Sequence, residues 1–237
     1  MNEICLHVLD AVYINYCVIN MIDYIAGVKA VNFIIAFYGS LPERLSKEYK
    51  EIAKGSIYPY IIYITNIGVL LTLFSIALGI TKHIKKTRNQ KLIYVHKFFT
   101  INGIGIESIV TFGYWTLYFM NPVNVNNPAL YNAGYRRPVI KEFSSHIYPI
   151  FALFFEGYFV EAKRESFYYY FLMIFGVVYY TASAIVARSY NGEWQYGFLT
   201  KMSTFYRIGV FCGFIMFAIA MIEVFIILQN KIKRRFK

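Results

Sequence analysis

The sequence predicts an all-α fold, a polytopic membrane helix bundle with six transmembrane helices. The composition carries this prediction, because 58% of the 237 residues are hydrophobic and only 16% are charged. A soluble domain has about 45–50% apolar and about 25% charged residues. Long apolar runs also recur along the chain, and short clusters of Lys and Arg separate them. Residues 1–237 are therefore interpreted as a single integral-membrane domain.

Five apolar segments each reach the length of about 20 residues that a spanning helix needs. They are residues 57–80, 98–120, 139–160, 167–187 and 205–229. A sixth segment covers residues 21–41 and ends at Leu41-Pro42, where proline stops a helix. Residues 1–20 form either an interfacial helix or a seventh span, and we favour six spans.

The cationic residues predict the orientation of these spans. The formal net charge is +11. The Lys and Arg residues form short clusters between the apolar runs, a pattern that fits contact with anionic lipid head groups better than binding of nucleic acid. Six basic residues and no acid lie between Lys82 and Lys97, and the tail from Lys231 is also basic. Such segments face the cytoplasm, so we expect both termini there, in the endoplasmic reticulum or the plasma membrane.

Polar groups inside the predicted spans are the candidate functional residues, because they are costly in hydrocarbon. They are Thr65-Asn66, Glu107, His146, Glu156 and Glu223. Each also has a structural interpretation, since threonine and histidine commonly hydrogen-bond within or between membrane helices. Glu142 lies four residues before His146, on the same helical face, and can accept a hydrogen bond from its ring.

Thr65 and His146 are predicted to lie at similar depths. The second and fourth spans both begin on the outer side, and the helical rise places Thr65 about 12 Å and His146 about 10 Å into them. A hydroxyl and an imidazole at one level are the minimum for an activated nucleophile and its general base.

Four stretches in order then match one family. They are "YITNIGVLL" (63–71), "YWTLYFMNPVNV" (114–125), His146 with Glu156 ten residues later, and "NGEWQYGFL" (191–199). With these, the chain from about residue 28 to 230 resembles the androgen-induced multi-pass membrane proteins that hydrolyse fatty-acid esters of hydroxy fatty acids. The chain departs from that pattern at Gly197, in the Phe-Ser-Ser before His146, and at Pro149, which is expected to bend the fourth span.

The resemblance implies a carboxylic-ester hydrolase with Thr65 as nucleophile and His146 as general base. It implies a lipid ester substrate within the membrane and no metal or cofactor, and it leaves the oligomeric state open. No oxyanion-stabilising group is assigned, because Asn66 points about 100° away from Thr65 on a helix. Tyr114, Trp115 and Tyr118 either line an acyl channel or are ordinary interfacial aromatics.

Two other classes stay open at this point. A small transporter or channel uses Glu107, Glu156 and Glu223 as a pathway, and a non-catalytic scaffold keeps the fold without the chemistry. No inverted repeat is visible in the sequence, which weakens the transporter interpretation.

Overall fold

The computed structural model describes residues 24–41, 48, 63–86, 88–126, 128–160, 168–191, 194 and 196–235. Within these residues it contains helices and turns but no β-strand, as the sequence predicts. The elements are the helix Tyr24–Ser40, α3 (Ile64–Ile84), α4 (Gln90–Met120), η2 (Pro122–Asn124), α5 (Pro128–Asn132), α6 (Val139–His146), α7 (Tyr148–Tyr158), α8 (Tyr168–Asn191), α9 (Gly197–Thr200) and α10 (Thr204–Arg235). The predictions for residues 1–20, 21–23 and 57–62 lie outside the described residues.

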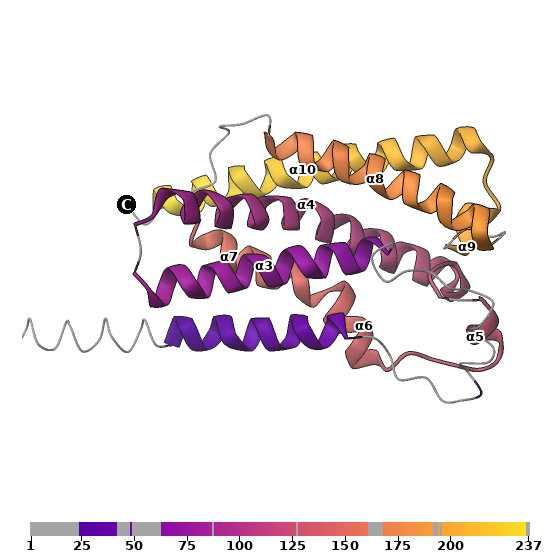
Figure 1. The fold of residues 1–237 in the computed structure, drawn as a ribbon, viewed down its shortest axis with the longest axis horizontal. Helices are drawn as coiled ribbons and strands as arrows, with labels where there is room; N and C mark the ends of the chain where they lie inside the picture. Colours follow the sequence, from indigo (N-terminus) through magenta and orange to yellow (C-terminus); the bar gives the residue numbers. More distant parts are fainter. Residues whose placement is uncertain are drawn as a thin grey trace, which may run out of the picture.

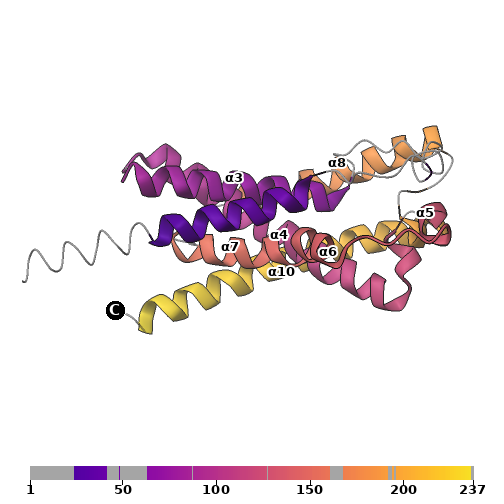
Figure 2. The same cartoon turned by 90° about the horizontal axis from the view of Figure 1, so that it is seen from below.

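The long helices lie side by side and alternate in direction (Figures 1 and 2). The helix Tyr24–Ser40, α4 and α8 run one way, whereas α3, the α6–α7 pair and α10 run the other way. The α3–α4 connection and the C-terminal end of α10 therefore share one end of the bundle, which we call the basic end. The Lys82–Lys97 segment and the described part of the tail thus lie at one end of the bundle, while the six-span topology stays a prediction.

Helix α4 forms the centre of the bundle. Residues 101–110 are all buried, and α3, α7, α8 and α10 pack against this helix. Close approach depends on small residues: a Cβ at Gly103 would lie 2.9 Å from Leu153 Cδ1, and one at Gly105 would lie 2.9 Å from Ile222 Cδ1. Such glycines let membrane helices pack closely. Close van der Waals packing holds these helices together, because the hydrophobic effect does not drive helix association inside a lipid bilayer.

Two helix boundaries differ from simple spans. The expected fourth span is two helices, because the backbone breaks at Ile147 (φ −125°, ψ −51°) just before Pro149. Proline removes a backbone donor and crowds the preceding turn, so the bend expected at Pro149 is present as a break directly after His146. The expected third span begins eight residues early, at Gln90, because the Asn89 side chain accepts hydrogen bonds from the first turn and caps the helix.

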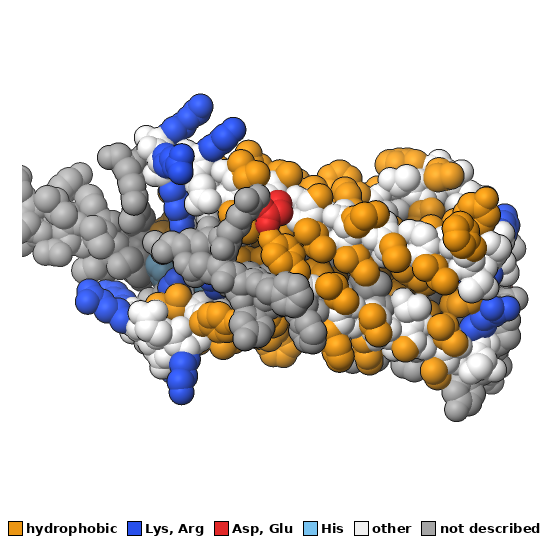
Figure 3. Space-filling model, turned by 90° about the horizontal axis from the view of Figure 1, so that it is seen from above, with side chains coloured by type: hydrophobic (Ala, Val, Ile, Leu, Met, Phe, Trp, Pro, Cys, Tyr) orange, Lys and Arg blue, Asp and Glu red, His pale blue; other side chains and the backbone are white. Residues whose placement is uncertain are grey.

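The exterior suits a membrane. Among the described residues, α3 and α10 are long and apolar enough to cross a bilayer, while Tyr24–Ser40 and Met173–Val186 are shorter apolar helices. In Figure 3, hydrophobic side chains cover the middle of the face, and Lys and Arg side chains gather toward the ends. An apolar band between basic ends is typical of a surface in contact with lipid.

Candidate functional site

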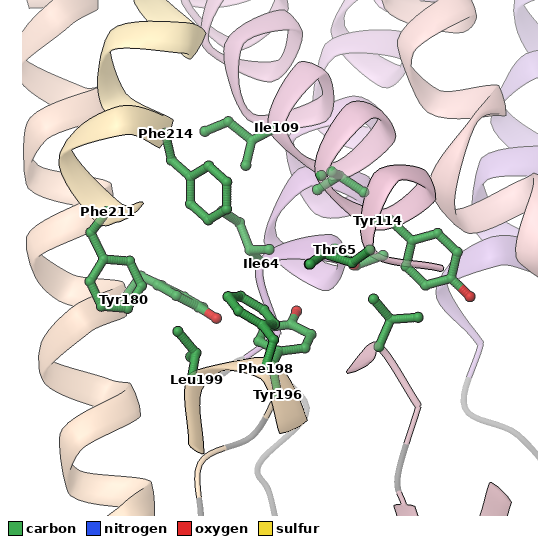
Figure 4. A pocket seen from close by; sticks show the side chains of 14 residues that line it. Ile64, Thr65, Ile109, Tyr114, Tyr180, Tyr196, Phe198, Leu199, Phe211 and Phe214 are labelled. Carbon is green, nitrogen blue, oxygen red and sulfur yellow. The ribbon is translucent and has the colours of Figure 1, made fainter. Parts of the chain in front are cut away.

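A cavity opens near the start of α3 and α9, at the end of the bundle opposite the basic end, which we call the cavity end (Figure 1); Figure 4 shows it from close by. The space in and around it that atoms do not fill, open solvent included, is about 480 Å³. Aliphatic and aromatic side chains form most of its walls, and the hydroxyl groups among the lining residues belong to one threonine and three tyrosines. The lining residues are Ile64, Thr65, Ile109, Val110, Gly113, Tyr114, Leu117, Val125, Tyr180, Tyr196, Phe198, Leu199, Phe211 and Phe214.

Thr65 contributes its hydroxyl to this cavity from the first turn of α3 (Figure 4). The depth expected for Thr65 counts from residue 57, whereas the described helix begins at Ile64, so Thr65 is its second residue. A first-turn position leaves nearby backbone amides without partners inside the helix. The Thr65 side chain hydrogen-bonds the hydroxyl of Tyr196, which is the residue that precedes α9.

Tyr196 brings the segment between α8 and α10 onto the cavity. Its hydroxyl also has hydrogen bonds to the Tyr180 side chain and to the backbone of Ile64. Desolvation raises the pKa of Tyr196 to about 12, and its hydrogen bonds with Tyr180, Thr65 and Ile64 moderate the rise. The phenol is therefore neutral near pH 7 and keeps a proton that it can donate.

His146 is the last residue of α6 and is buried. Its Nδ1 lies 2.9 Å from Glu142 Oε2, so the hydrogen bond predicted from the i,i+4 spacing is present. Glu142 also accepts a hydrogen bond of 2.6 Å from the Tyr114 hydroxyl, and Arg137 Nη1 lies 3.6 Å from the same oxygen. One carboxylate thus holds the orientation of an imidazole and a phenol.

Tyr114 links the two predicted catalytic residues. It lines the cavity together with Thr65, and its ring stacks on His146 with a centroid separation of 3.5 Å and an interplanar angle of 11°. Helix α3 packs against α6 and α7. His146 is not among the residues that line the cavity, and no hydrogen bond joins it to Thr65 within the described residues. The structure therefore places both residues around Tyr114 but not in direct contact.

The acids singled out by the sequence lie elsewhere. Glu156 is fully buried and pairs with the Lys29 ammonium and with His96 Nε2, at 3.1 Å from the latter. Glu107 is fully buried, with Oε1 3.5 Å from the Thr72 hydroxyl, and Glu223 accepts a hydrogen bond from the Tyr170 hydroxyl on α8.

Metal binding has no visible basis in the described residues, because no three His, Cys, Asp or Glu side chains gather there as a metal site requires.

Sequence reasoning missed the tyrosine hydroxyls and the partners of Glu156. Tyr196 lies within "NGEWQYGFL", which carries part of the family resemblance, but no spacing rule connects this segment to Thr65, 131 positions away. Tyr114 was left open between an acyl channel and an interfacial position, and it lines the cavity. Neither Trp115 nor Tyr118 is among the lining residues.

Comparison with known proteins supports the family resemblance. The sequence model of the FAR-17a/AIG1-like protein family matches residues 16–230, which is most of the chain. No curated protein and no solved structure matches the chain. The family match covers every helix described above apart from the last residues of α10. The chain belongs to the FAR-17a/AIG1-like family, which is the androgen-induced gene 1 family.

Proposed function

We propose that this chain is a membrane-embedded hydrolase of lipid esters, specifically of fatty-acid esters of hydroxy fatty acids. Thr65 is the nucleophile and His146 is the general base. The observation that carries this proposal is the Thr65 hydroxyl in a largely apolar cavity. An acyl chain fits such walls, and a hydroxyl group at the wall is where an ester carbonyl can be attacked.

The six helical tracks cross the bilayer in this proposal, namely Tyr24–Ser40, α3, α4, α6–α7, α8 and α10. The basic end faces the cytoplasm, because Lys and Arg concentrate on that side of membrane proteins. The cavity then lies toward the outer leaflet. A lipid ester can reach it from the bilayer without passing through water.

Glu142 prepares His146 for proton transfer. A proton on Nδ1 that is shared with the Glu142 carboxylate leaves the lone pair of Nε2 free to act as the base. Resting sites are often looser than reacting ones, so Nε2 reaches Thr65 when bound substrate draws α3 and α6 together. The Tyr114 ring, which contacts His146 and the cavity, is the side chain that must move to allow this.

The reaction then proceeds in two halves. Thr65 Oγ1 bonds to the ester carbonyl carbon while its proton passes to His146 Nε2, and the C=O electron pair moves onto the carbonyl oxygen. When that pair returns, the bond to the alkoxide breaks, and the alkoxide takes the proton from His146. Water then attacks the threonyl ester with the same base, which releases the free fatty acid and restores Thr65.

The test uses the purified full chain in lipid nanodiscs with a palmitoyl ester of a hydroxystearic acid. Thr65→Ala and His146→Ala are each expected to lower kcat by at least about 10³-fold and to abolish labelling by a fluorophosphonate probe. Thr81→Ala is the matched control, since this α3 threonine only donates to the backbone oxygen of Ala77, at 2.8 Å. Turnover by Thr65→Ala at the rate of the unmodified protein rejects the nucleophile assignment.

The transporter alternative has one observation in its favour. Glu107 and Glu156 are fully buried, and each has a carboxyl oxygen without a hydrogen-bond partner among the described residues. Proton flux into liposomes that falls in Glu107→Gln, from a protein without esterase turnover, would support this class instead.

A further inference from the structure

Tyr196 touches the oxygen that acts as nucleophile under the proposed function. We propose that the Tyr196 hydroxyl donates the hydrogen bond that stabilises the oxyanion formed when Thr65 attacks the ester, so that Tyr196 is a third catalytic residue. This inference rests on the proposed function. It supplies the one component of acyl transfer, an oxyanion donor, that the sequence leaves unassigned.

The ring of Tyr196 is held in place by aromatic neighbours on two sides. It packs edge-on against Tyr63, with a centroid separation of 6.0 Å, and lies 5.9 Å from the ring of Phe198. Tyr63 directly precedes α3, so the contact brings the Tyr196 hydroxyl to the first turn of that helix (Figure 4). A donor held by packing needs no reorganisation when charge develops, which is the basis of oxyanion stabilisation.

The hydrogen bonds of the phenol leave its proton available to the cavity. The backbone hydrogen bond with Ile64 stabilises the phenolate, so the Ile64 N–H donates and the Tyr196 oxygen accepts. Ile64 begins α3, and its N–H therefore has no acceptor within the helix. A hydroxyl oxygen that accepts a hydrogen bond becomes a stronger donor. Its high pKa keeps Tyr196 protonated throughout the neutral range.

The geometry of the attack places the oxyanion within reach of this donor. In the resting state the hydroxyls of Thr65 and Tyr196 share one hydrogen bond. Once Oγ1 bonds to the carbonyl carbon, the carbonyl oxygen sits on the atom next to Oγ1. The Tyr196 O–H, held beside Oγ1 by the packing of its ring, then donates to that oxygen. The proton of Oγ1 goes to His146, so Tyr196 keeps its own proton and no bond to it is made or broken.

Three other hydroxyl or amide groups near the cavity are less suitable. The Tyr114 hydroxyl donates its only proton to Glu142 Oε2 at 2.6 Å, and so is already used. Asn66 is adjacent to Thr65, but helical neighbours point about 100° apart. Tyr180 hydrogen-bonds the Tyr196 hydroxyl, and its role here is to position that group.

The first experiment compares Tyr196→Phe with Tyr180→Phe, since both variants keep the ring and remove one hydroxyl. For Tyr196→Phe we expect kcat to fall about 10²–10³-fold, as when one oxyanion donor is removed. KM should change little, because the lost bond forms in the transition state. For Tyr180→Phe we expect a loss of less than about tenfold, the size of one neutral hydrogen bond.

The outcomes separate this inference from the proposed function. If Thr65→Ala is inactive while Tyr196→Phe keeps the kcat of the unmodified protein, the oxyanion role is wrong and the threonine hydrolase stands. If Thr65→Ala is fully active, or the unmodified protein hydrolyses no ester, both proposals fall together.

A second measurement guards against a Tyr196→Phe variant that does not fold. Difluorotyrosine at position 196 keeps the hydroxyl and lowers its pKa. Because only the protonated phenol donates, we expect the alkaline loss of kcat to move to lower pH in this protein. A merely structural tyrosine leaves the pH profile where it was, and that result would overturn the inference.

Discussion

The two ends of the bundle bury polar side chains in opposite ways. At the cavity end, the hydroxyls of Thr65 and Tyr196 meet beside open space. At the basic end, Lys29, His96 and Glu156 meet as charged and ionisable groups, each no more than 1% exposed. The first arrangement leaves room for a ligand next to a reactive group. In the second arrangement the side chains contact one another directly, and Glu156 pairs with Lys29 and His96.

Packing around the basic-end cluster shows how closely it is filled. Gly79 faces Glu156, and a Cβ at that position would overlap Glu156 Oε2. The Lys29 ammonium lies 4.6 Å from the centre of the Phe159 ring, which adds a cation–π contact. Burial of a polar residue therefore does not separate the two ends, whereas a cavity beside the residue does.

The largest expected effect is on catalysis at the cavity end. Glu142→Gln keeps the side-chain size but removes the charge that orients His146 and receives the Tyr114 hydroxyl. We expect kcat to fall on the order of 10²–10⁴-fold, because the wrong tautomer of His146 is no longer disfavoured. Ester turnover in nanodiscs measures this. Glu223→Gln, which removes an acid outside the cavity lining, is the control, and equal losses in both variants would contradict the assignment.

The next effect concerns stability at the basic end. Lys29→Met leaves Glu156 buried without its ammonium partner, and we expect a loss of about 3–5 kcal/mol in the free energy of unfolding. Unfolding in mixed SDS micelles measures it. The double variant Lys29→Met with Glu156→Gln should be less destabilised than Lys29→Met alone, because the unpaired charge is gone. A double variant that is even less stable would show that the charge is not the cause.

A smaller effect is expected from Gly79→Ala. The added methyl group overlaps the Glu156 carboxylate, and overpacking of this kind costs about 1–3 kcal/mol. Gly176→Ala on α8 is the matched control, because a Cβ there meets nothing within 4 Å. The same unfolding assay should show Gly176→Ala at or slightly above the stability of the unmodified protein. Similar losses in both variants would show that overlap with the Glu156 carboxylate is not the cause of the loss.

The smallest effect is expected at the C-terminal end of α7. Lys233 Nζ donates to the backbone oxygen of Val160 at 2.9 Å, where a cation complements the carbonyl end of the helix. Lys233→Ala should cost about 0.3–1 kcal/mol, and less at high salt, because salt screens a partly exposed charge. A salt-independent loss would mean that packing of the lysine stem, rather than its charge, stabilises this end.

Much of the architecture follows from local patterns in the sequence. Apolar length predicts the helices, and Pro149 predicts the interruption of the fourth span. The earlier start of α4 could have been read from Asn89, a residue type favoured at helix N-termini, but the cations that follow it favoured a loop. The Glu142–His146 bond follows from the i,i+4 spacing, since helical neighbours four residues apart share a face.

Pairing between distant segments did not follow from such patterns. No pattern in the sequence assigned a partner to Glu156, and its partners Lys29 and His96 come from two other helices. Contacts of this kind depend on which faces of the helices turn inward, and in uniformly apolar helices the sequence hardly distinguishes one face from another.

By itself, the sequence determined the family resemblance and the helices, and it predicted Thr65 and His146 as the pair suited to ester chemistry. Apolar length, helical spacing and proline act within one segment, so they can be read without knowing the fold. Only the tertiary structure decided that Tyr196 meets Thr65, that Tyr114 lies against His146, and that Glu156 is used in an ion cluster. The physical reason is that these contacts join segments whose separation in the chain carries no information about their distance in space.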